Sequence, residues 1–135
     1  LLPLIFSHGS SPSAVMDQTN CVFLPDSHPD CPGKPLFIKR FPPELWSGCG
    51  EDNLLLIDDA CYKAALNPPG TSVHPPPWSH TSEDGDIVLG QLREVLSVFL
   101  RQGAAAAADE AVRSYAWSSP ATDRLYMEIQ EGAVA

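Results

Sequence analysis

The central part of the chain reads Asn53-Leu54-Leu55-Leu56-Ile57-Asp58-Asp59-Ala60. A short aliphatic run that ends abruptly in two carboxylates is typical of a buried strand in a parallel sheet. In open α/β sheets, ligands bind just beyond the carboxyl ends of the strands. We therefore expect Asp58 and Asp59 to lie at the edge of the sheet where such folds carry out their chemistry.

Two interpretations of this acidic pair are open at the level of local sequence. Carboxylates are the ligands that Mg²⁺ prefers, and the ion usually shares them with a phosphate group. Aspartate also begins helices and turns well, because its side chain accepts hydrogen bonds from backbone N–H groups.

Further motifs stand in a fixed order around the acidic pair. They are Met16-Asp17-Gln18-Thr19-Asn20-Cys21, Lys34-Pro35-Leu36-Phe37-Ile38-Lys39, Leu45-Trp46, and the stretch from Leu56 to Ala64 with the Asn67-Pro68 that follows it. With these motifs, the segment from about Ala14 to Pro77 resembles the C-terminal half of the NLI-interacting-factor-like domain. That domain occurs in the RNA polymerase C-terminal-domain phosphatases, here of the plant type, within the haloacid dehalogenase superfamily.

The resemblance implies an α/β fold. Residues 1–103 would form the C-terminal half of a haloacid-dehalogenase-like Rossmannoid domain, which has three layers and a parallel sheet. This half would be incomplete and would carry long proline-rich loops. Residues 104–135 would form a helical, partly disordered C-terminal extension.

The resemblance also implies roles for three residues. In a complete domain Mg²⁺ would be held by Asp59, or by Asp58 through water. Lys39 would neutralise the charge of the phosphate and of the aspartyl-phosphate intermediate. In the family the nucleophile is the first aspartate of an Asp-x-Asp motif at the end of the first strand, and the sequence offers no such strand. We therefore expect a fragment of a Mg²⁺-dependent serine/threonine phosphatase-like protein that is inactive alone and whose substrate is a phosphoprotein.

The same domain is used without catalysis in a receptor subunit of the mitochondrial inner-membrane presequence translocase. The alternative function is thus a scaffold for protein import, in which an acidic surface meets basic presequences. A non-catalytic phosphatase-like protein is a third interpretation. These alternatives leave the compartment open between the nucleus or cytoplasm and the mitochondrial inner membrane.

Composition excludes some classes of function. The net charge is −9, whereas direct nucleic-acid binding needs a basic face. No apolar run approaches the roughly 20 residues that span a membrane. The spacing of the four cysteines from one another and from the histidines does not match a zinc site, so free and mostly buried thiols are expected.

Local patterns predict the remaining elements. Leu92, Val95, Leu96, Phe99 and Leu100 form the apolar stripe of a helix that is stopped by Gly103. The other expected elements are strands at 13–17, 21–24, 53–57 and 71–74, helical turns at 35–41, 44–46 and 62–66, a helix or frayed linker at 104–117, and an irregular tail at 118–135. Trp78 is expected over the edge of the sheet.

Overall fold

The structure is a computed structural model that describes residues 12, 14–25, 28–81 and 83–132. Its strands are β1 (Val22–Leu24), β2 (Leu36–Ile38), β3 (Leu56–Ile57) and β4 (Ser72–Val73), and its α-helices are α2 (Pro43–Cys49), α3 (Gly85–Gln102), α4 (Ala104–Tyr115) and α5 (Arg124–Gln130). Four short 3₁₀ helices accompany them: η1 (Gln18–Asn20), η2 (Glu51–Asn53), η3 (Cys61–Ala64) and η4 (Pro120–Thr122). The chain is a small mixed α/β protein.

The described strands form two small sheets rather than the one parallel sheet that the sequence predicts. β1 and β2 are antiparallel, and Phe23 lies opposite Phe37. β3 and β4 are parallel, with Leu56 opposite Ser72 and Ile57 opposite Val73. The predicted strand that ends at Ile57 is confirmed at its carboxyl end, and its pairing is parallel. The expectation that this strand is buried is wrong, because Leu56 is only partly buried and Ile57 is 39% exposed.

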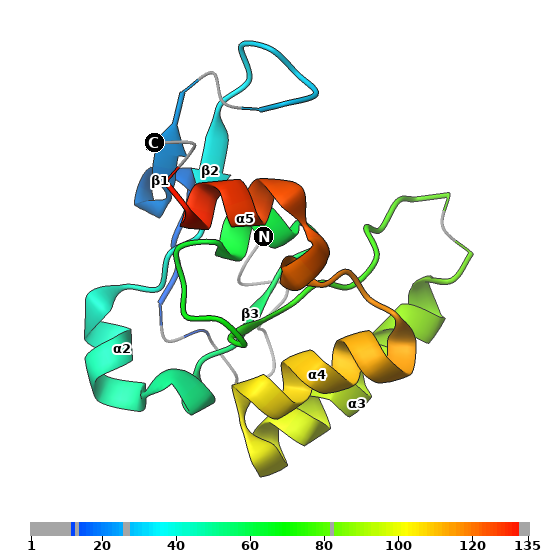
Figure 1. Cartoon of the computed structure of the whole chain (residues 1–135). Coiled ribbons are helices and arrows are strands. Elements are labelled where there is room, and N and C mark those ends of the chain that lie inside the picture. The colour runs from blue at the N-terminus through cyan, green and yellow to red at the C-terminus, as the bar shows by residue number, and fades with distance from the viewer. Residues whose placement is uncertain (1–11, 13, 26–27, 82, 133–135) are drawn as a thin grey trace.

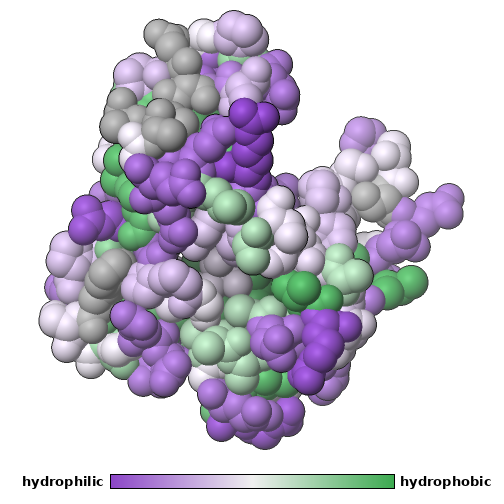
Figure 2. Space-filling view, viewed as in Figure 1, coloured by the Kyte–Doolittle hydropathy of each residue, from purple (hydrophilic) through white to green (hydrophobic). Residues whose placement is uncertain are grey.

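Two apolar clusters hold together the elements that Figure 1 labels. The first joins β2, η3 and α5 through Leu36, Ile38, Cys61, Ala64, Ala65, Tyr126 and Ile129. The second joins β4, α3 and α4 through Val73, Val95, Ala107, Ala111 and Trp117. Helices α3 and α4 lie side by side below the strands, and hydrophobic atoms gather over this layer in the lower half of Figure 2.

The prediction of a helical turn at 35–41 is wrong. Residues 36–38 form a strand in which Leu36 and Ile38 are fully buried while Phe37 is only partly buried. This alternation has the period of two that belongs to a strand with one buried face. The predicted strand at 13–17 is not formed by its described residues, and regular pairing starts at Val22.

The irregular tail that the sequence predicts is also wrong over its described part. Asp123 caps α5 by accepting a hydrogen bond from the backbone N–H of Tyr126 at 2.7 Å. Tyr126 and Ile129 are three positions apart on one helical face, and both are buried in the first cluster. Packing against η3 therefore stabilises a seven-residue helix that would not be stable alone. The expected division of the chain into a domain of residues 1–103 and an extension of residues 104–135 stays a prediction.

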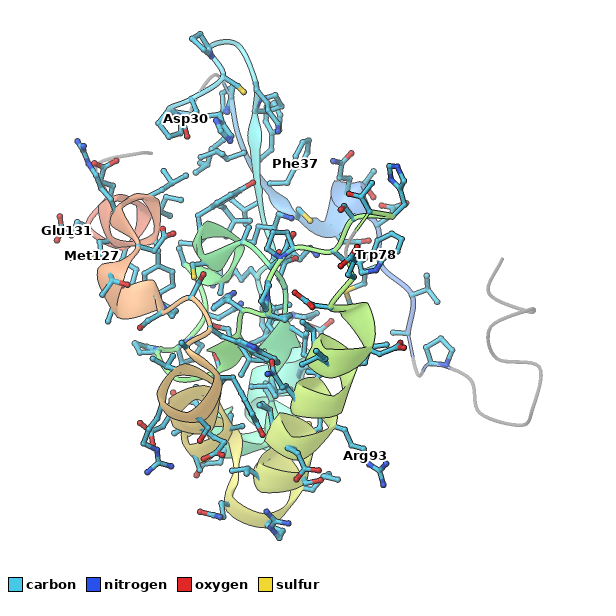
Figure 3. The ribbon with its side chains drawn as sticks, turned by 90° about the vertical axis from the view of Figure 1, so that its right-hand side faces the viewer. Asp30, Phe37, Trp78, Arg93, Met127 and Glu131 are labelled. Atoms are coloured by element: carbon cyan, nitrogen blue, oxygen red, sulfur yellow. The ribbon has the colours of Figure 1, made fainter. Side chains whose placement is uncertain are left out.

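Two further expectations fail in detail. Only Cys61 is buried, whereas Cys31 and Cys49 are exposed and Cys21 is half-buried. Trp78 is 73% exposed and contacts the beginning of α3 at Gly85 rather than the edge of a sheet (Figure 3). None of the helices in the described ranges combines the length and the apolarity that spanning a bilayer requires.

Gly103 joins α3 to α4 in a conformation that other residues avoid. Its φ is +93°, and an added Cβ would lie 3.2 Å from Cβ and 3.3 Å from the backbone oxygen of Asp52. We expect Gly103→Ala to lower the free energy of unfolding by about 1 to 2 kcal/mol, as measured by urea titration, because it adds backbone strain and a clash. Gly90→Ala is the control. Gly90 lies inside α3 with open space around it, so alanine there should raise stability by about 0.5 to 1 kcal/mol.

Candidate functional site

The candidate site is centred on the carboxylate of Asp58, directly after β3. The side chain of Asp58 is only 4% exposed, and the ammonium groups of two lysines engage it. Lys39 Nζ donates to Oδ2, and Lys63 Nζ lies 3.3 Å from Oδ1. The backbone N–H of Ala60 also donates to Oδ1, at 3.0 Å. Asp58 thus serves as a turn cap, as one interpretation predicted, and in addition forms a buried ion-pair cluster.

Backbone hydrogen bonds bring the two lysines to the same place. The N–H of Lys39 donates to the carbonyl of Lys63 at 2.8 Å, which ties the end of β2 to η3. The buried amide of Asn67 donates to the Lys39 carbonyl at 2.7 Å and accepts from the Phe41 N–H at 2.7 Å. Asn67 therefore fixes the chain on both sides of Arg40, and with it the origin of the Lys39 side chain.

The surroundings of Asp58 keep it ionised. Burial acts to raise the pKa of the Asp58 carboxyl group, but the hydrogen bonds from Lys39 and Ala60 and the charges of Lys63 and Lys39 outweigh it. The pKa of Asp58 therefore lies below its ordinary value of 3.8. With two ammonium groups around one carboxylate, the cluster of Lys39, Asp58 and Lys63 carries one surplus positive charge at neutral pH.

His74 holds the backbone of Asp58 in place. It is 1% exposed, and its Nδ1 lies 2.7 Å from the backbone carbonyl of Asp58. A carbonyl can only accept, so Nδ1 donates and Nε2 accepts from the Ser72 hydroxyl at 2.9 Å. Burial lowers the pKa of His74, against the opposing effect of the hydrogen bond to Asp58 and of nearby carboxylates. His74 is thus a neutral structural residue that holds the end of β3 in place.

Asp59 differs from Asp58 in its surroundings. Its side chain is exposed, and it makes no ion pair within the described residues. Both oxygens of Asp58 are already engaged by cations, so the donor set fits Mg²⁺ only through Asp59, with water and a phosphate supplying further oxygens. Nowhere in the described part of the chain do three or more His, Cys, Asp or Glu side chains come together as a metal site.

Sequence reasoning placed Lys39 and Asp58 in one site, and the structure brings these two together while leaving Asp59 at its exposed edge. The sequence analysis gave no role to Lys63 or Asn67. Lys63 is five residues after Asp58, beyond the turn that Ala60 begins, and this short separation was the available signal.

Comparison of the chain with protein-family models, with curated proteins and with solved structures gives no significant match.

Proposed function

We propose that this chain is the C-terminal half of a haloacid-dehalogenase-type phosphatase-like domain, in which the cluster of Lys39, Asp58 and Lys63 binds the phosphoryl group of a phosphoprotein. The observation that carries the proposal is the meeting of Lys39 with Asp58 at the carboxyl end of β3. Open α/β sheets bind their ligands at that end.

The cluster has the charge that phosphate recognition requires. Asp58 neutralises one of the two lysines, which leaves one positive charge for a bound anion. The Lys39 side chain is 46% exposed, so its ammonium group can contact solvent and ligand while it stays anchored to the carboxylate. A positioned ammonium group stabilises the negative charge that is spread over a phosphoryl group during transfer.

Mg²⁺ belongs to the proposal through Asp59, and a bound ion would neutralise further charge on the phosphate. The nucleophilic aspartate of the family would come from residues outside this sequence. The chain alone should therefore bind a phosphate ester without hydrolysing it.

The test is a titration of the full chain with inorganic phosphate and O-phosphoserine, followed by backbone amide NMR shifts. We expect shifts around residues 39–41 and 58–64. Lys39→Gln should weaken binding by at least about tenfold, which corresponds to about 1.4 kcal/mol. Arg93→Gln, on the exposed surface of α3 (Figure 3), removes the same charge and should leave the affinity unchanged.

Equal losses in both variants would show that only net charge matters, and the proposal would then fail. Mg²⁺ should strengthen phosphate binding in the unmodified chain. Asp59→Asn should remove that strengthening without changing the affinity measured in the absence of metal.

A receptor for basic segments is the second candidate, and one surface favours it. A groove of about 590 Å³ lies between the proline-rich segment 75–77, Trp78 and the start of α3. Asp84, Asp86 and Leu89 also line it, so it combines carboxylates with exposed apolar surface. Binding of a basic amphipathic peptide that changes the fluorescence of Trp78, together with no phosphate binding, would favour this function over the first.

A further inference from the structure

A cleft of about 780 Å³ adjoins the cluster of Lys39, Asp58 and Lys63. Both lysines line it, together with residues from segment 16–21, from β2 and the chain that follows it, and from η3. Sites for small ligands usually enclose about 300 to 1,000 Å³. The cleft is thus large enough for a ligand that extends well beyond a phosphate group.

The alternation of β2 gives this cleft an aromatic wall. Leu36 and Ile38 point into the first cluster beneath α5, so Phe37 projects to the other side (Figure 3). Lys39 follows two positions after Phe37, and both side chains line the cleft. Phe41 and Tyr62 line it as well. The Lys39 side chain therefore shares the cleft with three aromatic side chains.

The same cleft is positively charged in a protein whose net charge is −9. Four of the eight lysine and arginine residues of the chain line it: Lys34, Lys39, Arg40 and Lys63. Asp17 is the only carboxylate among the described residues that line it, and that group already accepts hydrogen bonds from the N–H and the hydroxyl of Thr19. Within the described residues, Lys34 and Arg40 form no ion pair. A concave surface of this kind attracts anions.

We propose that the cleft recognises an aryl phosphate, with the phosphate on the cluster of Lys39, Asp58 and Lys63 beside Arg40, and the aromatic ring against Phe37 and its aromatic neighbours. The inference rests on the proposed function and specifies that the bound phosphate is esterified to an aromatic rather than an aliphatic alcohol. Pairs of aromatic rings are more favourable than their buried area alone accounts for. An aryl ester should therefore be preferred over an alkyl ester of equal charge. Such a ring could belong to a phosphotyrosine side chain or to a free aromatic phosphate.

The test compares phenyl phosphate, butyl phosphate and inorganic phosphate on the full chain by isothermal titration calorimetry. We expect phenyl phosphate to bind at least about fivefold more tightly than butyl phosphate. Phe37→Leu should bring the two esters to within about twofold of each other. Phe99→Leu is the matched control, because Phe99 packs against the second cluster without lining the cleft, and it should preserve the preference.

The outcomes separate this inference from the proposed function. If both esters bind with equal affinity and Lys39→Gln weakens both, the aryl specificity is wrong and the phosphate site stands. If no phosphate compound binds, both fail. The comparison of phenyl with butyl phosphate needs no variant, so the inference can be tested even if Phe37→Leu does not fold.

A phosphotyrosine peptide distinguishes the two sources of the aryl group. Tighter binding of the peptide than of phenyl phosphate supports the inference with a protein ligand. Equal affinity supports it with a free aromatic phosphate.

Discussion

Ile38→Ala is expected to lower the free energy of unfolding by about 3 kcal/mol, which is the usual cost of truncating a fully buried aliphatic side chain. Ile38 is 0% exposed and belongs to the cluster that joins β2, η3 and α5. Alanine would leave a cavity among elements that come from three distant parts of the sequence. Lys39 is the next residue, so the loss of packing should also loosen the site.

Urea titration followed by circular dichroism measures this effect, and Phe23→Ala is the control. Phe23 lies on β1 and is 54% exposed, so its truncation should cost less than about 1 kcal/mol. Equal costs for the two variants would mean that the first cluster does not form as described. In the Ile38→Ala variant, amide hydrogen exchange should accelerate in α5 as well as in β2, because both depend on the same cluster.

Asp58→Asn should lower the free energy of unfolding by about 2 to 3 kcal/mol at pH 7, since the lysines lose a buried carboxylate. The full cost of breaking a buried ion pair is not expected, because Lys39 and Lys63 stay partly in water, where ion pairs contribute less. The asparagine side chain can still accept the hydrogen bond from the Ala60 N–H. The loss therefore measures the ion pairs rather than the turn.

The stabilisation by Asp58 should depend on pH and should weaken in acid. The pKa of Asp58 is lower in the folded protein than its ordinary value of 3.8, so the folded state favours the ionised form. The stabilisation is complete above the unfolded pKa and is lost as the pH falls below about 4 and passes through the folded pKa. The difference between the unmodified chain and Asp58→Asn should therefore shrink as the pH falls below about 4.

Asp59→Asn is the matched control for the acid series. Its carboxylate is exposed one residue away, so in metal-free buffer the change should alter stability by less than about 0.5 kcal/mol at every pH. If Asp59→Asn reproduced the loss seen with Asp58→Asn, the role of Asp58 in the buried cluster would be wrong.

The elements that sequence patterns predicted well are those with strong local periodicity or a clear stop signal. The stripe that includes Val95 predicts α3, although its member Leu100 is 83% exposed. Gly103 ends that helix with a conformation that favours glycine. The aliphatic run ending at Ile57 predicts β3, and the expectation that Lys39 and Asp58 lie close together is met. The roles that the family resemblance implies for them stay predictions.

The elements that sequence patterns missed are short, and distant contacts decide their structure. Residues 36–38 are too few to show a period, and their pairing with β1 makes them a strand. The segment that forms α5 is helical because Tyr126 and Ile129 pack against η3 in the first cluster.

The same distinction holds for the site. The residue types around Asp58 indicated an acidic pair with a lysine before it, and this was enough to expect a charged site after β3. Local sequence could not show that Asp58 would be buried in ion pairs while Asp59 stays exposed. Asp58 forms the ion pairs because it is buried and because folding places Lys63 beside its carboxylate. Spacing along the chain reports local conformation, whereas the protonation and accessibility of a side chain depend on neighbours that only folding brings within a few ångströms.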